Sequence, residues 1–160
     1  MNHHELIKEW TGILEEFFAT RSSTLGEAIE ECVRSLQAGR KILVFGNGGS
    51  AAEAQHFAAE MVNKFRIKRP AICVIALTTD TSILTSIGND ISFDSIFSRQ
   101  VEGLGVAGDI ALALSTSGNS PNVVKALRTA RKKKMTTIGL TGRGGSKMAP
   151  LCDFLLDVPS

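Results

Sequence analysis

Apolar residues in the first part of the chain recur every three or four positions, which is the spacing of one face of an α-helix. The pattern predicts two amphipathic helices within residues 1–38, the second capped by Ser22, Ser23 or Thr24 and ended by Gly39. The apolar positions are Leu6, Trp10, Ile13, Leu14, Phe17 and Phe18 in the first helix, and Leu25, Ile29, Val33 and Leu36 in the second.

After residue 39 the pattern changes to short runs that are apolar throughout and alternate with helical segments. The predicted strands are 41–45, 71–76, 109–114, 135–140 and 153–158, and the predicted helices are 50–65, 82–86, 95–104 and 121–133. Strands without polar alternation are typical of a parallel sheet covered on both faces, joined by right-handed crossovers. We therefore expect one α/β domain over residues 1–160, in which the N-terminal helices precede a doubly wound five-stranded parallel sheet of flavodoxin-like order 2-1-3-4-5.

Composition narrows the function without identifying it. The chain has 160 residues, of which 43% are hydrophobic and 21% charged, as in an ordinary globular domain. The net charge of +2 is too small for a surface that binds nucleic acid, so no nucleic-acid partner is expected. The densest basic run, residues 131–134, ends a predicted helix and there complements the helix dipole.

The cysteines and the N-terminus predict a cytoplasmic protein. Cys32, Cys73 and Cys152 lie far apart and form no CxxC pair, which favours a reducing compartment over a disulfide framework or a zinc ribbon. The first residues contain no apolar signal core. No apolar run approaches the roughly 20 residues of a membrane span, so no membrane partner is expected.

The glycine-rich loop Gly46-Asn47-Gly48-Gly49-Ser50 follows the first predicted strand and opens a helix. Glycines allow a ligand to approach the backbone, and a helix N-terminus offers free amides, so the loop predicts an anion site. A tight turn without a ligand is the plainer interpretation. The loop also matches G-x-G-x-x-A, but a dinucleotide site needs an acidic residue about 20 positions on, and Asp80 lies roughly thirty positions on, past the second strand.

The loop after the third predicted strand is rich in hydroxyl groups. Residues 115–121 read Ser-Thr-Ser-Gly-Asn-Ser-Pro, with the proline suited to the first position of the next helix. Hydroxyls and helix amides match the oxygens of a phosphate monoester, although such residues also fill turns and caps. Strands one and three are neighbours in the predicted order, so a sugar phosphate could lie across both loops.

His56 and Glu60 are four residues apart on the helix after the glycine-rich loop, and they share one helix face. Such a pair can ligate a metal or act as acid and base. It can equally be a hydrogen-bonded pair on the surface.

These motifs, in this order, resemble the SIS-domain phosphoheptose isomerases. The resemblance is carried by Gly46-Asn-Gly-Gly-Ser50, Gln55-His-Phe-Ala-Ala-Glu60, Ile87-Gly-Asn-Asp90, Ser115-Thr-Ser-Gly-Asn-Ser120 and Leu140-Thr-Gly-Arg-Gly-Gly145. It implies isomerisation of sedoheptulose 7-phosphate to D-glycero-D-manno-heptose 7-phosphate through an enediol, in the synthesis of lipopolysaccharide heptose. It also implies a homotetramer with sites at subunit interfaces. The aromatic residues of the first predicted helix would supply that oligomer's core.

The resemblance also assigns roles to residues. It implies zinc as the cofactor, with His56 and Glu60 as two ligands and Glu60 also as the catalytic base. The remaining site residues would bind the sugar phosphate, with the four hydroxyl residues holding the phosphate group: Asn47, Gly48, Gly49, Ser50, Asn89, Asp90, Ser115, Thr116, Ser117 and Ser120. In the family a following helix supplies a glutamine and a histidine as further ligands, and the sequence ends at Ser160, before that helix.

A second function stays open at this point. The chain also resembles a non-catalytic SIS protein that associates with the bacterial replication initiator, notably over residues 55–59 and at Arg69-Pro70. The position of Glu60 is not acidic in that family, so Glu60 favours the isomerase. Another SIS sugar-phosphate-binding protein is a further alternative. Turnover is the observation that separates these functions.

Overall fold

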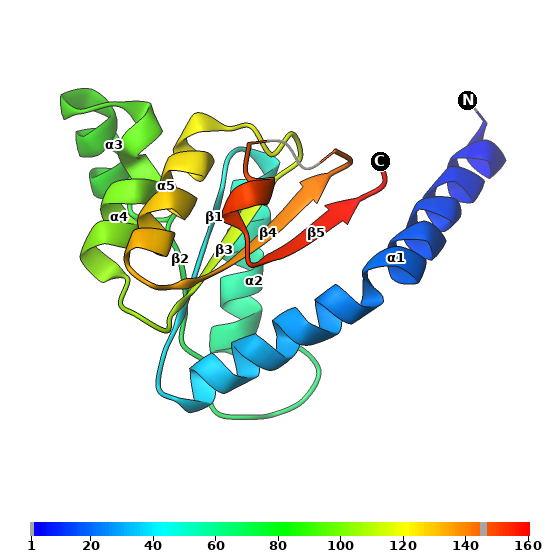
Figure 1. Ribbon diagram of the computed structural model, residues 1–160, viewed down its shortest axis with the longest axis horizontal. Helices are drawn as coiled ribbons and strands as arrows, with labels where there is room; N and C mark the ends of the chain where they lie inside the picture. The colour runs from blue at the N-terminus through cyan, green and yellow to red at the C-terminus, as the bar shows by residue number, and fades with distance from the viewer. Residues whose placement is uncertain (1, 145–146) are drawn as a thin grey trace.

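The computed structural model describes residues 2–144 and 147–160, and its centre is a parallel sheet of five strands (Figure 1). The strand order is β2-β1-β3-β4-β5, which confirms the predicted α/β fold and order. The strands are β1 (Ile42–Gly46), β2 (Val74–Ala76), β3 (Ile110–Ser115), β4 (Thr136–Gly142) and β5 (Phe154–Val158). The helices are α1 (His3–Gln37), α2 (Gly49–Val62), α3 (Thr81–Asp90), α4 (Ile96–Leu104) and α5 (Pro121–Lys132), with short 3₁₀ turns at Phe93–Ser95 and Ala149–Leu151.

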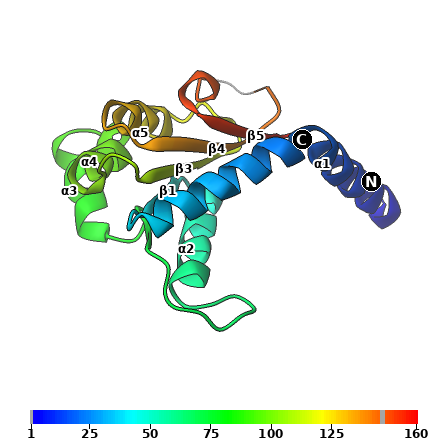
Figure 2. The ribbon, with the colours of Figure 1, turned by 60° about the horizontal axis from the view of Figure 1, so that its bottom comes forward.

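The sheet has a hydrophobic core on each face. In β1, Leu43 and Phe45 belong to the cluster with α4 and α5, whereas Ile42 and Val44 belong to the cluster with α1 and α2. All five residues of this strand are buried, because successive side chains point to opposite faces and both faces are covered. Figure 2 shows the two layers, with α1 and α2 on one side of the sheet and α3, α4 and α5 on the other.

The N-terminal region is one helix, so the prediction of two helices is wrong. Helix α1 is capped by Asn2, whose side chain accepts from the backbone amide of Glu5 at 3.0 Å, and it runs for 35 residues from His3 to Gln37. The hydroxyl residues predicted to cap a second helix lie inside it instead. Ser22 donates its hydroxyl to the carbonyl of Phe18, a bond that satisfies the side chain without interrupting the helix. Such bonds often accompany a bend, and α1 is bent along its length in Figure 1.

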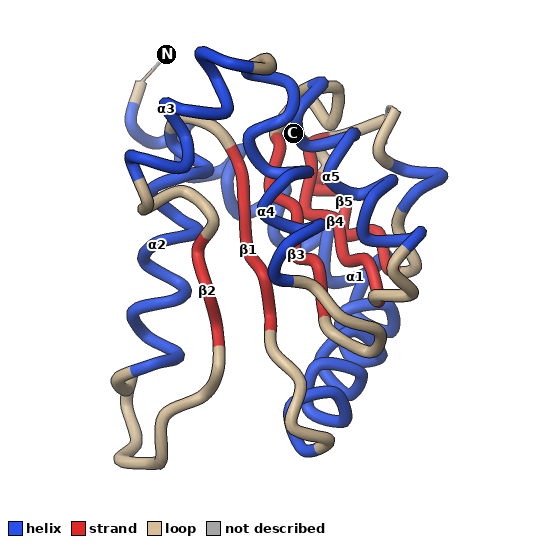
Figure 3. Tube along the Cα trace, turned by 90° about the vertical axis from the view of Figure 1, so that its left-hand side faces the viewer, coloured by secondary structure: helices blue, strands red, loops and turns tan. Residues whose placement is uncertain are grey.

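Strand β2 is shorter than predicted and lies at the edge of the sheet beside β1 (Figure 3). Only Val74–Ala76 pair with β1. The amide of Ile72 donates instead to the carbonyl of Met61 at 3.1 Å, so the start of the apolar run is held by the end of α2. Asp80 then caps α3 by accepting from the amide of Ile83 at 2.9 Å, which gives it a structural role.

Across residues 2–144 and 147–160, no helix has the length and apolar character needed to cross a membrane.

Candidate functional site

The glycine-rich loop and the hydroxyl-rich loop lie next to each other at the carboxyl ends of β1 and β3. The two strands pair up to Gly46, which lies opposite Leu114. A Cβ at position 46 would lie 2.6 Å from the carbonyl oxygen of Leu114 and 2.7 Å from the Cβ of Ser50. Gly46 is therefore what allows the two strand ends to come this close.

The glycine-rich loop ends at the N-terminus of α2. Gly48 adopts φ 55° and ψ −121°, a conformation that favours glycine, and its carbonyl accepts from the amides of Ala51 and Ala52. The first amides of a helix have no partner within the helix and can meet an anion. The loop therefore has the backbone geometry of an anion site, with the hydroxyl of Ser50 beside it.

The hydroxyl-rich loop is a turn closed at Gly118. Its amide donates to the carbonyl of Ser115 at 3.0 Å and to the hydroxyl of Ser115 at 3.1 Å, and Gly118 has φ 58°. The hydroxyl oxygens of Ser115 and Ser120 are 3.3 Å apart. Pro121 occupies the first turn of α5, as predicted, and Ser120 makes no side-chain cap bond. The hydroxyl of Ser120 thus faces that of Ser115 and is not used to cap the helix.

A pair of asparagine side chains joins the two loops. Asn47 donates to Asn122 Oδ1 at 2.8 Å, and Asn122 donates to Asn47 Oδ1 at 3.0 Å. Asn122 lies in the first turn of α5 and is buried. Asn122 follows the hydroxyl-rich loop directly, but the sequence does not reveal its pairing, because Asn47 is distant along the chain.

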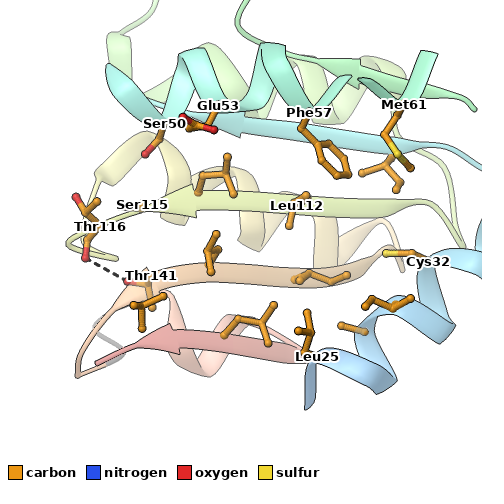
Figure 4. Close-up of a pocket in the computed structure, with 18 of the residues that line it drawn as sticks. Leu25, Cys32, Ser50, Glu53, Phe57, Met61, Leu112, Ser115, Thr116 and Thr141 are labelled. Carbon is orange, nitrogen blue, oxygen red and sulfur yellow. Dashed lines mark hydrogen bonds between the residues drawn. The ribbon is translucent and has the colours of Figure 1, made fainter. Parts of the chain in front are cut away.

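A cavity of about 870 Å³ opens beside the two loops (Figure 4). One end is polar, where Ser50 and Glu53 of α2 face Ser115 and Thr116, and the hydroxyl of Thr141 bonds the carbonyl of Thr116. The rest is apolar and is walled by α1, α2 and the sheet, including Leu25, Cys32, Phe57, Met61, Leu112 and Leu140. Glu53 is a lining residue that the sequence pattern did not predict. Its position one helical turn after Ser50 is the one feature of the sequence that places it near the loop.

His56 and Glu60 lie on α2 but not in the lining of this cavity. His56 Nε2 is 4.0 Å from Glu60 Oε1, and the two side chains are 68% and 32% exposed. They share a helix face, as predicted. Among the described residues no group of three or more His, Cys, Asp or Glu side chains could hold a metal ion.

Asn89 and Asp90 lie at the end of α3, where Asn89 Nδ2 donates to Asp90 Oδ1 at 2.7 Å. Asp90 lines a separate, open hollow of about 480 Å³. Within the described residues no hydrogen bond joins this pair to either loop. One chain therefore brings together the residues of the two loops but not Asn89 and Asp90. Gly145, the last residue of the fifth motif, lies outside the described residues.

Comparison with known proteins agrees with this geometry. A family model described as the SIS domain matches residues 5–142. Over 150 residues the chain is 53% identical to a phosphoheptose isomerase of Nitratidesulfovibrio vulgaris, an alignment that covers 94% of this chain and 72% of the relative.

Solved structures of phosphoheptose isomerases also resemble this chain. A phosphoheptose isomerase from Neisseria gonorrhoeae superimposes with a TM-score of 0.90 at 44% identity, covering 98% of this chain and 84% of that one. One from Francisella tularensis gives a TM-score of 0.92 at 35% identity, covering 100% and 87%.

Proposed function

The chain belongs to the SIS domain family, within which its relatives are phosphoheptose isomerases, and we propose that it converts sedoheptulose 7-phosphate to D-glycero-D-manno-heptose 7-phosphate. One observation carries this proposal. The glycine-rich loop and the hydroxyl-rich loop, the two ligand loops, lie next to each other at the ends of β1 and β3, in a chain that is 53% identical to a phosphoheptose isomerase. The heptose phosphate would serve the synthesis of lipopolysaccharide.

The phosphate group is proposed to bind at the hydroxyl-rich loop, next to the polar end of the cavity that Ser115 and Thr116 line. Its oxygens accept hydrogen bonds from the hydroxyls of Ser115, Thr116, Ser117 and Ser120, and from backbone amides of the same loop. Among the described residues no hydrogen bond occupies the amides of Ser117 and Ser120, so both can donate to a ligand. Asn47, Gly48, Gly49 and Ser50 would meet the sugar from the neighbouring loop. Binding the phosphate far from the reacting carbons provides energy for orienting them.

The isomerisation needs one base placed beside C1 and C2. We propose that the carboxylate of Glu60 removes a proton from C1 of the ketose, which leaves the anion of an enediol, with the negative charge on O2. The same group returns a proton to C2, while the hydroxyl proton on O1 is transferred to O2. The C1–O1 bond becomes the aldehyde and the C2–O2 bond becomes a hydroxyl, so the two sugars are isomers. A carboxylate base of this kind contributes about 10²–10⁴-fold to the rate.

The site is proposed to be completed by a second subunit in a homotetramer. In the described residues no hydrogen bond joins Asn89 or Asp90 to the two loops of their own chain, which fits a role in a neighbour's site. The N-terminal half of α1 carries large apolar side chains with no cover in a single chain. These are Leu6, Ile7, Trp10, Leu14 and Phe18, which are 37–66% exposed.

Zinc is proposed as the cofactor, on the family resemblance. His56 and Glu60 would be two of its ligands, and zinc prefers nitrogen and carboxylate donors of this kind. Zinc sites use three or four protein ligands, and the described residues supply two here, so further ligands would come from outside them. When bound, zinc would polarise the carbonyl oxygen of the sugar. A cytoplasmic location is proposed as well, because all three cysteines are free thiols.

The proposal is tested by mixing the purified protein with sedoheptulose 7-phosphate in deuterium oxide, with and without added zinc. We expect the aldose product to form and to carry deuterium at C2, detected by NMR. Turnover that requires zinc supports the cofactor as well. A protein that binds the sugar phosphate by calorimetry, yet never forms product or exchanges the proton, contradicts the isomerase and favours the initiator-associating relative.

A further inference from the structure

Asn122 is a buried residue, and among the described residues its one side-chain partner is the proposed substrate residue Asn47. Asn122 is 2% exposed, and its carboxamide exchanges two hydrogen bonds with that of Asn47, at 2.8 and 3.0 Å. A buried amide that both accepts and donates hydrogen bonds favours one orientation, because turning it over would leave polar groups unpaired.

The orientation of this amide is determined by a third bond. Asn122 Oδ1 also accepts from the amide of Val123 at 2.9 Å, so the oxygen receives two N–H donors. Exchanging oxygen and nitrogen would place the NH₂ group against both donors. The orientation of Asn47 follows from that of Asn122. Asn47 then keeps one N–H and one lone pair that are not used by Asn122, and these can bind a ligand.

The pair of Asn47 and Asn122 also joins the glycine-rich loop to the start of α5, past the point where β1 and β3 stop pairing. The ladder between β1 and β3 ends at Gly46 and Leu114. Past that point, in the part of the chain that the structure describes, the only hydrogen bonds between residues 47–50 and 115–122 are those of Asn47 with Asn122. The separation of the two ligand loops therefore depends on this bridge.

We propose that Asn122 is a positioning residue of the isomerase site, an inference that rests on the proposed function. It orients the amide of Asn47 toward the sugar, and it sets the distance between that amide and the phosphate-binding hydroxyls. Asn122 itself does not touch the substrate. A displacement of about 1 Å in a site can cost on the order of 100-fold in rate, so a side chain that sets this distance affects catalysis from outside the site.

The first test is Asn122→Asp, which keeps the shape and the acceptor that faces Asn47 and Val123. The ionised carboxylate cannot donate to Asn47 Oδ1, so Asn47 must turn away. We expect kcat/KM at pH 8 to fall by about 10- to 100-fold. The ratio of variant to wild-type kcat/KM should rise as the pH falls, because a protonated carboxyl regains the donor. Asn63→Asp, at the exposed end of α2, is the matched control and should show a constant ratio.

The second test asks whether Asn122 acts through Asn47. Asn122→Ala should lower kcat/KM about 10-fold in the wild-type background and by no more than about 2-fold in an Asn47→Ala background, because residues that act as one unit are not additive. Full additivity of the two changes would overturn the proposal. So would an Asn122→Asp enzyme with wild-type kcat/KM at every pH. Circular dichroism establishes that each variant folds, and Asn122→Asp carries the test if Asn122→Ala does not.

The wild-type assay separates this inference from the proposed function. If the wild type turns over, the kinetic tests above decide the role of Asn122. If it does not, the isomerase proposal fails, and the same pair of alanine changes is measured by calorimetry with sedoheptulose 7-phosphate. Additive losses of affinity would then overturn the positioning role, and a loss from Asn122→Ala that disappears in the Asn47→Ala background would support it.

Discussion

At the scale of single residues, Asp109 shows how a buried charge is held. Its side chain is fully buried and accepts from the Lys41 ammonium at 2.7 Å and from the amides of Lys41 and Val106 at 3.1 and 2.9 Å. Burial raises the pKa of this carboxyl, but the hydrogen bonds from Lys41 and Val106 outweigh it, so the pKa lies below its usual range. The ionised form is therefore the one that stabilises the fold.

The lowered pKa of Asp109 predicts that the free energy of unfolding decreases in acid. Because its pKa is lower in the folded chain, its contribution is complete above the unfolded value, about 3.9, and is lost as the pH falls through the folded value. Asp109→Asn should lower the free energy of unfolding at pH 7 by about 3 kcal/mol, measured by urea denaturation. The gap between wild type and variant should narrow at pH 3. Asp94→Asn, at an exposed position, is the control, and an equal gap at both pH values would contradict the argument.

Replacing the proposed base Glu60 should lower the rate of the chemical step. Glu60→Gln keeps the size of the side chain and its hydrogen bonding but removes the proton acceptor. We expect kcat to fall by about 10²–10⁴-fold at saturating zinc, while sugar-phosphate binding persists through the loops. Deuterium exchange at the reacting carbons should fall in parallel. A variant that isomerises at the wild-type rate would remove Glu60 from the mechanism.

The serines of the second loop predict an effect on binding. Replacing Ser115, Ser117 and Ser120 together by alanine removes three hydroxyl donors to the phosphate. Each hydrogen bond to a charged acceptor is worth about 1.5–3 kcal/mol, so calorimetry should show a large loss of affinity for sedoheptulose 7-phosphate. Unchanged affinity would mean that the loop is only a turn. Thr129→Ala, which removes a hydroxyl from the exposed face of α5, is the control.

At the scale of elements, the ends of β1 and β3 can lie next to each other because position 46 has no side chain. Gly46→Ala would place a methyl group 2.6 Å from a backbone oxygen of β3, and a backbone atom cannot move away cheaply. We expect a loss of about 1–3 kcal/mol in stability from overpacking and a higher KM, because the two ligand loops are forced apart. Gly103→Ala, in α4 with nothing within 4 Å of its Cβ, should leave both unchanged or raise stability slightly. Equal effects of the two changes would count against this role for Gly46.

At the scale of the whole molecule, the exposed stripe of α1 predicts assembly. Trp10 and Phe18 are 66% and 53% exposed. They belong to the N-terminal half of α1, and this half of the helix extends beyond the sheet in Figure 1. A contiguous apolar surface of this kind marks an interface. Light scattering at micromolar concentration should report a tetramer, and Trp10→Glu with Phe18→Glu should dissociate it and abolish turnover. Ala19→Glu is the control, and a wild-type monomer would refute the prediction.

The sequence by itself determined the features that depend on neighbouring residues. Apolar runs such as 41–45 and 109–114 predicted buried parallel strands, because a strand covered on both faces tolerates no polar alternation. The glycines at 46 and 48 and the hydroxyls from 115 to 120 predicted two loops at strand ends. Both loops are present beside each other, because parallel strands all end at one edge of the sheet.

Only the tertiary structure decided the features that depend on distant partners. Ser22 could cap a helix or lie within one, and the continuous helix it belongs to is also held against β5 by the ion pair of Arg21 with Asp157. Val74–Ala76 form a short strand because Ile72 bonds to α2 rather than to β1. The pairing of Asn122 with Asn47 gives no sequence signal, because the two residues are far apart along the chain. Local patterns act over a few residues, whereas these outcomes follow from packing and hydrogen bonds between segments far apart along the chain.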